Sequence, residues 1–386
     1  MRIAVFAPVF WPYRGGMGRV VDNEVKELQK NDCQVDIFTP RYSCSWLKEE
    51  EWFGSKIYRL EPLLKFGNAA VIKIKKEVEL QDYDILHLHY PFIGGVKEVL
   101  RFKKEKNLPL VVTYHMDLVA RGWRGLFFKI YSWLTLPKIF KNADRIVFSS
   151  LDYGQNSFFS NYLKKQPNKF SAIPFGVEKK ELKMSSTEVR DQLGLNQKEK
   201  IILFVGALDK AHYFKGLDVL FSALKKINKE QTGFKAVVIG DGELKNKYQK
   251  KAQRFNLDKQ IIFKGLVSDE DLIKYYRAAD LLILPSITAS EAYGMVVIEA
   301  AGQGLLSVVS NLPGVREQVA SFGKVFKLGD SDDLSRKILD ILSNESNFKK
   351  MSEEAEKWAQ KNRSVTEEAR QLADVYKLVA KKKHFC

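Results

Sequence analysis

Cysteine is scarce in this chain of 386 residues, and its three copies, Cys33, Cys44 and Cys386, lie far apart. An odd number of scattered cysteines excludes a disulfide-stapled extracellular scaffold and predicts free thiols in a reducing compartment. No apolar run approaches the roughly 18 residues that a membrane-spanning helix needs, so we expect none. The amino terminus MRIAVFAPVF lacks a charged leader and a cleavage site and is typical of a buried first strand. We therefore expect no signal peptide and a cytoplasmic location.

Acidic residues are few relative to basic ones: 47 Asp and Glu stand against 63 Lys and Arg, a net charge of +16 with a pI near 9.4. This excess indicates an anionic partner, which could be a nucleotide, a phospholipid surface or a nucleic acid. Paired zinc-ligand spacings and aromatic ribonucleoprotein motifs are both missing, so we expect no nucleic acid. A hydrophobic share of 45% and a mean hydropathy of −0.26 predict a soluble protein.

Short apolar runs rich in β-forming residues alternate with helical patterns along the chain. They lie at 2–8, 34–40, 56–60, 84–90, 109–115 and 145–150, and then at 201–208, 235–240, 261–265, 281–286 and 306–310. This alternation predicts an α/β fold with parallel sheets between helices. Because 386 residues exceed the usual size of one core, we expect two doubly wound, Rossmann-like domains, divided by the Pro/Gly punctuation at 172–176. Ligands of such sheets bind beyond the carboxyl ends of the strands, which a central cleft between the domains would gather.

The run EAYGMVVIEAAG at 291–302 places two carboxylates, Glu291 and Glu299, around a glycine turn that opens a helix. Glu291 stays in the loop and Glu299 lies more than one turn inside the helix, so the two acids can reach different parts of one ligand. The amides of the helix start would form an anion site, and they belong to Gly294, Met295 and Val296. If Glu299 is buried, it needs a donor such as a ribose hydroxyl; the alternative is a solvated helix residue.

This pair of acids resembles the acid-x7-acid motif of the retaining nucleotide-sugar glycosyltransferases of family 4, and the resemblance covers nearly the whole chain. It implies the GT-B type of fold and the transfer of a sugar from a nucleoside diphosphate sugar to a hydroxyl, with Glu291 as a catalytic residue. It further implies an acceptor-side domain of residues 1–176, completed by the C-terminal helix at 365–386, and a nucleotide-sugar donor domain of residues 177–364.

Glycines and a histidine at strand ends supply candidates in the first domain. Gly15 and Gly16 precede an amphipathic helix, where a plain turn is the alternative to a phosphate or sugar contact. They resemble the family's glycine loop at the donor diphosphate. His115 ends the strand VVTYHMD and is followed by Asp117, which could position the imidazole; a structural histidine is the alternative. The family places the histidine of such a TxHxD run against a sugar hydroxyl, and we assign that catalytic role to His115.

His87 and His89 alternate on one face of a strand, but a metal site there would need a third ligand that the sequence does not identify. We therefore reject a zinc site. The fold needs no DxD motif, and DSDD at 330–333 is typical of a helix cap. We predict no metal and no cofactor besides the nucleoside diphosphate sugar, which is a co-substrate.

The segment after the second domain's first strand carries Lys210, His212 and Lys215. Lys215, at a helix start, can hold its ammonium against a leaving diphosphate as a catalytic residue; a solvated lysine is the alternative. In the commoner family pattern an arginine follows the strand glycine directly, but here Ala207 follows Gly206. Lys210 or His212 would substitute, with a differently shaped grip because lysine lacks the guanidinium fork.

Two more turns resemble parts of the family's donor pocket. Gly242 lies in VIGDGELK, which resembles the GxGx turn, and Leu266 lies in the segment that reads the base through backbone groups. Uridine, guanosine and adenosine donors therefore stay open. Retention, which the family implies, requires a carboxylate nucleophile or same-face attack by the acceptor. We find no clear nucleophile and favour same-face attack, in which the leaving phosphate oxygen accepts the acceptor's proton.

The stretch 118–143 carries cations and aromatic residues but no acid. Its apolar residues recur at helical spacing and predict a face that packs on the first sheet, with Trp123 in the core. The cations, among them Arg121, Arg124 and Lys129, would lie with other aromatic rings on the remaining faces, which suits an anionic membrane interface.

We predict a metal-independent, hexosyltransferase-like enzyme of glycan biosynthesis, cytoplasmic and peripheral at the inner membrane face. Its partners would be a nucleotide-sugar donor, a lipid-linked or glycan acceptor and an anionic membrane. The alternatives are the same chemistry on a soluble acceptor and a non-catalytic nucleotide- or anion-binding protein. A same-fold epimerase or phosphorylase would need a different acid pair or a cofactor lysine, neither of which we find. The sequence leaves the donor sugar, the linkage and the oligomeric state open.

Overall fold

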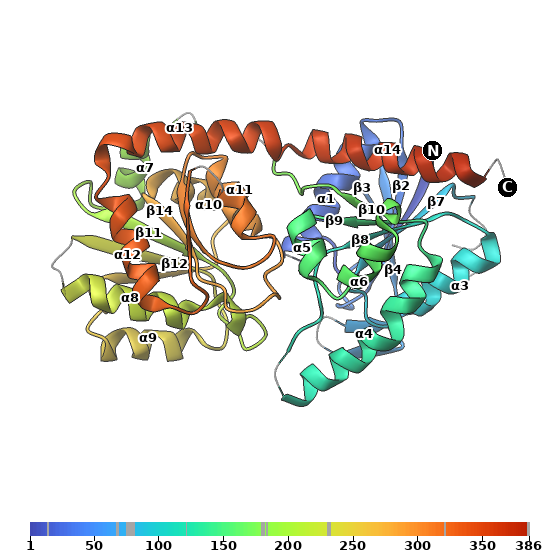
Figure 1. The fold of residues 1–386 in the computed structure, drawn as a ribbon, viewed down its shortest axis with the longest axis horizontal. Coiled ribbons are helices and arrows are strands. Elements are labelled where there is room, and N and C mark those ends of the chain that lie inside the picture. The colour runs from blue at the N-terminus through green and yellow to red at the C-terminus, as the bar shows by residue number, and fades with distance from the viewer. Residues whose placement is uncertain are drawn as a thin grey trace. The chain divides into compact units, whose positions relative to one another are not determined.

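The computed structural model describes residues 1–386 apart from 14, 67–68, 75–81, 121, 179–181, 183, 230–232, 320–321 and 384–386. The chain divides into two compact units, which we call unit 1 (Met1–Glu178 with Ser364–Cys386) and unit 2 (Lys179–Arg363). Each unit holds a predominantly parallel sheet with helices, so the predicted α/β fold with two Rossmann-like domains is confirmed (Figure 1).

Unit 1 is built on a sheet of eight strands in the order β10-β9-β8-β7-β1-β2-β4-β3, in which only the pair β3 and β4 is antiparallel. The strands of this sheet are β1 (Arg2–Phe6), β2 (Gln34–Pro40), β3 (Glu49–Trp52), β4 (Ser55–Leu60), β7 (Ile85–Tyr90), β8 (Leu110–Tyr114), β9 (Arg145–Phe148) and β10 (Phe170–Ala172). A separate antiparallel ribbon consists of β5 (Leu64–Phe66) and β6 (Ala69–Val71). The α-helices are α1 (Gly16–Gln29), α3 (Val96–Lys106), α4 (Gly122–Asn142), α5 (Leu151–Asn156), α6 (Ser160–Lys165) and α14 (Val365–Lys383), with a 3-10 turn at Pro167–Lys169.

Helices α1 and α14 pack against each other over one face of the unit 1 sheet. Their apolar stripes recur every three or four residues, which is the spacing of one helix face. The stripe of α1 includes Val21, Val25 and Leu28, and that of α14 includes Leu372 and Tyr376; both join one core with β1, β2 and β7. The C-terminal helix α14 therefore completes unit 1, although the residues of unit 2 separate α14 from the rest of unit 1 in the sequence.

Unit 2 is built on six parallel strands in the order β13-β12-β11-β14-β15-β16. The strands are β11 (Lys200–Val205), β12 (Phe234–Ile239), β13 (Ile261–Gly265), β14 (Leu281–Leu284), β15 (Leu306–Ser310) and β16 (Lys324–Phe326). The helices are α7 (Ser186–Leu193), α8 (Leu217–Lys229), α9 (Lys245–Arg254), α10 (Asp269–Ala278), α11 (Met295–Ala301), α12 (Ser331–Leu342) and α13 (Glu345–Asn362), with 3-10 turns η2 (Tyr213–Lys215) and η3 (Arg316–Val319). The first three strands proceed in one direction across the sheet and the last three proceed in the other, so the order reverses between β11 and β14.

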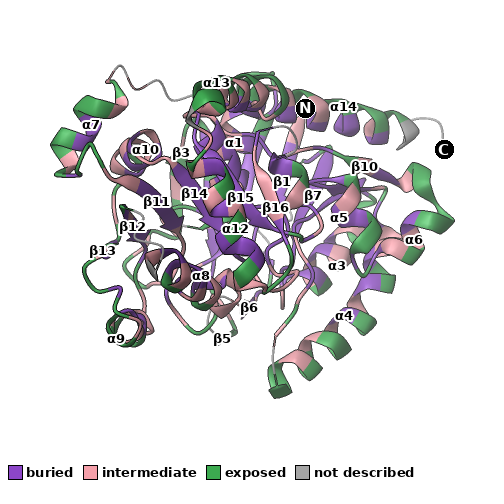
Figure 2. Ribbon diagram, turned by 60° about the vertical axis from the view of Figure 1, so that its left-hand side comes forward, coloured by how far each residue is buried: buried purple, intermediate pink, exposed green. Residues whose placement is uncertain are grey.

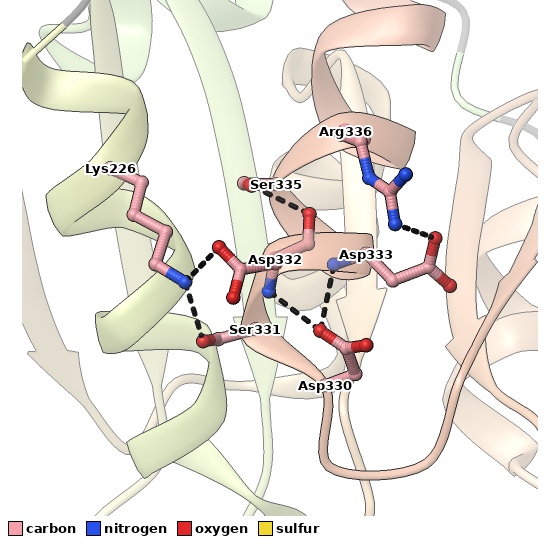
Figure 3. A network of polar contacts seen from close by, with 7 residues as sticks. All are labelled: Lys226, Asp330, Ser331, Asp332, Asp333, Ser335 and Arg336. Atoms are coloured by element: carbon pink, nitrogen blue, oxygen red, sulfur yellow. Dashed lines mark hydrogen bonds and ion pairs between the residues drawn. The ribbon is translucent and has the colours of Figure 1, made fainter.

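The acidic run at the start of α12 is a helix cap, as predicted. The carboxylate of Asp330 accepts hydrogen bonds from the N–H groups of Asp332 and Asp333, both at 2.9 Å (Figure 3). Lys226 of α8 adds an ion pair to Asp332 and so ties α8 to the start of α12. Asp330 thus satisfies two amides that a helix start leaves without intrahelical partners, and Asp333 accepts from the Lys327 N–H at 2.8 Å. Protein donors therefore account for this acidic run.

Candidate functional site

Unit 2 brings two of the predicted catalytic side chains together where the order of its strands reverses. Lys215 ends η2 in the loop after β11, and Glu291 lies in the loop after β14, the neighbour of β11 in the sheet. Lys215 Nζ lies 2.6 Å from Glu291 Oε2, and the two side chains are 18% and 10% exposed. Ligands of doubly wound sheets bind at such a reversal, beyond the carboxyl ends of the strands. The ion pair therefore occupies the place where a nucleotide is expected.

Gly216 explains how these two loops come so close. Its φ of +70° lies in the left-handed region, and a Cβ at this residue would lie 1.9 Å from the carbonyl oxygen of Pro285. The N–H of Ile287 donates to the carbonyl oxygen of Phe214 at 2.8 Å and joins the same loops. Because only glycine fits this approach, the backbone itself holds Lys215 beside the loop that carries Glu291.

Glu291 has a second donor in Ser286, a residue that the sequence did not single out. The Ser286 hydroxyl donates to Glu291 Oε2 at 3.1 Å, so one carboxylate oxygen accepts from both Ser286 and Lys215. No side chain in the described part of the chain hydrogen-bonds to Glu291 Oε1. The site can thus present an ammonium to an anion and a carboxylate oxygen to a hydroxyl at the same time.

Gly242, expected in the donor site, packs the loop after β12 against the loop after β11. Its φ is +150°, and a Cβ there would lie 2.6 Å from the carbonyl oxygen of Leu208. At Gly240 the corresponding distance to the Gly206 carbonyl oxygen is 1.9 Å. The Leu208 N–H also donates to the carbonyl oxygen of Asp241 at 2.9 Å. These glycines therefore have a packing reason that is independent of a ligand.

Three other predicted donor-site residues of unit 2 lie in exposed or half-exposed positions. The Lys210 side chain is 76% exposed and its Nζ lies 3.3 Å from Glu243. His212 Nδ1 lies 2.9 Å from the carboxylate of Asp209. Leu266, directly after β13, is 79% exposed. The Lys215 N–H donates to the carbonyl oxygen of His212 at 3.0 Å, but no side-chain hydrogen bond or ion pair links Lys210 or His212 to the Lys215–Glu291 pair among the described residues. Their role in place of the missing arginine stays a prediction.

Glu299 lies on α11 and is half-buried, with the Tyr276 hydroxyl donating to its Oε2 at 2.9 Å. Gly294 is the N-cap of α11 with φ +83°, which gives the glycine turn that the sequence predicts. No backbone carbonyl of a described residue accepts from the N–H groups of Met295 or Val296, as is usual in the first turn of a helix. Glu299 therefore has a protein donor, Tyr276, which the sequence did not indicate.

His115 follows β8 in unit 1 and is 6% exposed. Its Nε2 lies 2.8 Å from Nδ1 of His89 at the end of β7, and its ring stacks on Phe175 with 5.0 Å between the centroids. Asp117 does not contact His115, because its carboxylate accepts a hydrogen bond from the Tyr114 hydroxyl instead. The expectation that Asp117 positions the imidazole is therefore wrong, and His89 has that place.

Glu24 of α1 is a further residue that the sequence reasoning missed. Its Oε2 lies 3.4 Å from His89 Nε2, and Glu24, His87 and His89 are close enough to meet one ion. Our reason for rejecting a metal, the lack of a third ligand, is thus wrong. The imidazoles already bond to protein groups, however. His87 Nδ1 lies 2.8 Å from the Tyr376 hydroxyl and His87 Nε2 lies 2.8 Å from the Thr113 hydroxyl, while His89 Nδ1 bonds to His115 Nε2. We assign the cluster to hydrogen bonding, and the absence of a metal stays a prediction.

Gly15 and Gly16 lie where the strand order of unit 1 reverses. They follow β1, whose neighbours in the sheet are β7 and β2, and the strands after β7 continue away from β1. Gly15 is the N-cap of α1, and its carbonyl oxygen accepts from the Arg19 N–H at 3.0 Å. The glycine loop and His115 therefore follow strands on either side of this reversal, which is the usual ligand position.

Helix α4 exposes the apolar face that we expected to be packed. Trp123 is 76% exposed and Trp133 is 75% exposed, and none of the residues 122–131 is buried (Figure 2). We call this surface the α4 patch, and its apolar members are Trp123, Leu126, Phe127, Ile130, Trp133 and Leu134. The prediction that Trp123 lies in the core is wrong, because α4 buries residues only in its second half.

Basic residues accompany the α4 patch. The Arg124 guanidinium lies 5.6 Å from the centre of the Trp123 ring, within the range of a cation–π contact. Lys129 is exposed, and Arg121 lies outside the described residues. No helix in the described ranges combines the length and the apolar character of a membrane span.

Comparison with known proteins extends over both units. The family described as "Glycosyltransferase Family 4" matches residues 14–177, and the one described as "Glycosyl transferases group 1" matches residues 185–358. The chain is 32% identical to O-antigen chain mannosyltransferase C of Escherichia coli over 57% of its own length and 54% of that protein's length, so it spans about half of this relative. It is 26% identical to alpha-monoglucosyldiacylglycerol synthase of Streptococcus pneumoniae over 89% of its own length and 78% of that protein's length.

Among solved structures, sucrose-phosphate synthase from Thermosynechococcus elongatus superposes with a TM-score of 0.80. The superposition covers 98% of each chain at 20% sequence identity. Such a likeness shows the fold alone, and it agrees with the two predicted Rossmann-like domains.

Proposed function

The chain belongs to the family 4 glycosyltransferases, and we propose that it transfers a sugar, with retention, from a nucleoside diphosphate sugar to a hydroxyl of a lipid-linked or glycan acceptor. The names of two relatives support this acceptor class, since one is a mannosyltransferase of an O-antigen chain and the other a synthase of a glucosylated diacylglycerol. The proposal assigns the nucleoside diphosphate of the donor to unit 2. It assigns to His115 a hydrogen bond with a hydroxyl of the donor sugar, the role that the family resemblance implies.

The Lys215–Glu291 pair at the strand reversal of unit 2 is the observation that carries the proposal. Negative charge develops on the diphosphate as the bond to the sugar breaks, and a preorganised ammonium stabilises that charge. Lys215 supplies the ammonium, while Glu291 keeps it in place through Oε2 and offers Oε1 to a sugar hydroxyl. A lysine in this role gives the reaction the cation that it needs, so the proposal includes no metal ion.

We propose same-face attack for the transfer step. The acceptor oxygen forms a bond to the anomeric carbon on the side from which the diphosphate departs, and the bond between that carbon and the phosphate oxygen breaks. The electron pair of the broken bond stays on the diphosphate, whose oxygen takes the proton of the acceptor hydroxyl. Configuration is then retained without a carboxylate nucleophile.

Release of nucleoside diphosphate from a panel of UDP-, GDP- and ADP-sugars tests the enzyme proposal. The protein is incubated with each donor in the presence of EDTA, with and without vesicles that contain diacylglycerol, and the anomeric configuration of any product is read by NMR. We expect one donor class to turn over at full rate in EDTA with retained configuration. Binding of nucleotides without release would indicate a non-catalytic protein, and activity restored only by a divalent ion would contradict the metal-free step.

We further propose that the α4 patch contacts an anionic membrane, where a lipid acceptor would be presented. An apolar helical surface of this kind is costly in water, and tryptophan rings with arginine and lysine are typical of membrane interfaces. Residues 118–143 contain no acid that would repel anionic headgroups. The combination of exposed Trp123 and Trp133 with Arg124 and Lys129 therefore favours a lipid surface over a protein partner of mixed charge.

Vesicle cosedimentation with two matched pairs of substitutions tests the membrane proposal. The variant Arg124→Ser with Lys129→Ser should bind vesicles of anionic lipid more weakly, by about 1 kcal/mol for each cation at low salt. The control variant Lys104→Ser with Lys106→Ser removes two exposed cations from α3 and should bind as the wild type does. Equal binding by both variants, or binding that salt does not weaken, would favour a soluble acceptor.

A further inference from the structure

A continuous series of buried polar side chains runs from α14 to His115 in unit 1. Its members are Glu368 on α14, Glu24 on α1, His89 on β7 and His115 after β8, and none is more than 6% exposed. The series lies under α1 and α14, on the face of the sheet that is otherwise filled by apolar residues. A polar series in such a core must satisfy its own donors and acceptors, because no solvent reaches it.

The contacts along the series define an order. The Gly176 N–H donates to Glu368 Oε2 at 2.7 Å, and the carboxyl groups of Glu368 and Glu24 hydrogen-bond to each other. Glu24 Oε2 lies 3.4 Å from His89 Nε2, and His89 Nδ1 lies 2.8 Å from His115 Nε2. No described residue hydrogen-bonds to His115 Nδ1, so this nitrogen is the end of the series.

Protonation of both acids satisfies every member. Glu368 Oε1 and His89 Nε2 are buried and, among the described residues, have no hydrogen-bond partner of good geometry; the nearest acid to His89 Nε2 is Glu24 Oε2 at 3.4 Å. Two ionised carboxylates in contact would repel each other, whereas a proton on each acid gives the pair a donor. Burial raises the pKa of Glu24 to about 8 and that of Glu368 well above its usual range, so both acids hold protons at neutral pH. Burial also lowers the pKa of His115 to about 3 and that of His89 well below its usual value, so both imidazoles are neutral.

A neutral imidazole has one donor nitrogen and one acceptor nitrogen. If one nitrogen of a histidine accepts a hydrogen bond, its other nitrogen must donate, so a donor at one end of the series fixes the tautomer of each histidine along it. A proton on Glu24 Oε2 points to His89 Nε2, which must then accept. His89 Nδ1 in turn carries a hydrogen and donates to His115 Nε2. His115 is left with its hydrogen on Nδ1, at the free end. The neighbouring His87 bonds to the Tyr376 hydroxyl through Nδ1 and to the Thr113 hydroxyl through Nε2, so it is not part of this series.

We propose that Glu24 and His89 are positioning residues that fix the tautomer of His115, so that its Nδ1–H donates a hydrogen bond to a hydroxyl oxygen of the donor sugar. The identity of the ligand rests on the proposed function, whereas the tautomer is a property of the free protein. Loss of the Glu24 proton would reverse the series and turn Nδ1 into an acceptor. The series therefore sets the hydrogen-bond polarity of a catalytic residue from within the core under α1 and α14.

The tautomers can be measured directly by NMR of the full chain labelled with 15N-histidine, since the sequence has five histidines. We expect His115 in the Nδ1–H form at neutral pH without any ligand. The variant Glu24→Gln should keep that form even at pH 9, because its amide N–H replaces the carboxyl donor. The variant Glu24→Leu removes the donor and should shift His115 toward the Nε2–H form.

Two controls separate this role from a structural one. Tyr376→Phe deletes a buried hydrogen bond to His87 in the same core and should leave the His115 tautomer unchanged. With a nucleotide sugar that the wild type uses as a donor, Glu24→Leu should lower kcat/KM about five- to tenfold, the size expected for one neutral hydrogen bond. The kcat/KM of Glu24→Gln should stay near that of the wild type.

An Nε2–H form of His115 in the wild type at neutral pH would overturn the inference, and so would an unchanged form in a folded Glu24→Leu variant. One equivalent of zinc in the purified protein that is lost with Glu24→Leu would also overturn it, because the series would then be a metal site. Absence of sugar transfer with the expected tautomers would refute the proposed function and leave the assignment of the tautomer standing.

Discussion

Replacement of Lys215 by methionine tests the central residue of the proposed mechanism. Methionine keeps most of the length of the side chain and removes the ammonium, so the loop after β11 loses its charge and little of its packing. Glu291 then remains beside Ser286 alone, in a position where its side chain is only 10% exposed. The substitution therefore changes two quantities, the free energy of unfolding and the stabilisation of the transition state.

The geometry of the pair sets the size of both effects. Opposite charges 2.6 Å apart attract by about 6 kcal/mol at an effective dielectric of about 20, most of which offsets the cost of removing them from water. Loss of one partner from a fully buried pair costs about 3–5 kcal/mol. Because both side chains keep some exposure and Ser286 still donates, we expect unfolding to become easier by about 1–3 kcal/mol. Loss of one preorganised charge should lower kcat by about 100- to 1,000-fold.

The two effects can be separated with a double variant and an unrelated ion pair. Lys215→Met combined with Glu291→Gln removes both charges and should recover much of the stability, yet kcat should stay low because the ammonium is still missing. Lys226→Met removes the ion pair between α8 and the start of α12 and should cost no more than about 1 kcal/mol of stability, with unchanged kcat. Urea unfolding and release of nucleoside diphosphate provide the two measurements. If Lys215→Met keeps kcat within about threefold of wild type, Lys215 is a structural residue and the mechanism is wrong.

Two further predictions concern Glu299 and the pH dependence of stability. Glu299→Ala should weaken nucleotide binding by roughly 1–3 kcal/mol in calorimetry, because a ribose hydroxyl would lose its acceptor; unchanged affinity would exclude Glu299 from the donor site. The raised pKa of Glu24 stabilises the fold below the unfolded value of 4.5, and this contribution is lost as the pH rises toward about 8. On the acid side, His87 and His115 have their pKa lowered from 6.5 to about 3, so stability is lost as the pH falls through that window. The urea midpoint of the wild type relative to Glu24→Leu should therefore fall between pH 5 and pH 8, and a constant difference would show that Glu24 is charged in the fold.

The strands of both sheets were predictable because parallel strands are buried on both faces. Each expected run, from 2–8 to 306–310, overlaps a strand of the structure. The strands outside the expected runs are short: β3 has four residues, and β5, β6, β10 and β16 have three each. So few residues carry too little pattern to distinguish a strand from a loop. The carboxyl ends of strands were therefore known before the side chains at those ends could be paired.

The apolar face of α4 could not be assigned from its spacing. A helical stripe predicts that one face meets an apolar environment, but core, partner and membrane give the same stripe. The structure leaves Trp123 and Trp133 exposed, and only then does the absence of acids from 118–143 become informative. The packing excludes the core as the environment of Trp123 and Trp133, and the absence of acids supports the membrane contact that we propose.

The buried acids of unit 1 show what a pattern can still reveal once it is read for its exceptions. Glu24 stands between Val21 and Leu28 on the apolar stripe of α1, and Glu368 has the same relation to Leu372 on α14. An acid at such a position must find a partner inside the core. Glu24 and Glu368 are partners because α1 and α14 pack side by side. Two buried carboxyl groups in contact would repel each other if both were ionised, so their contact requires protonation. Helical periodicity thus locates both carboxyl groups. The contact of Glu24 with His89, and of His89 with His115, depends on the register of β7 and β8, which no local pattern of α1 contains.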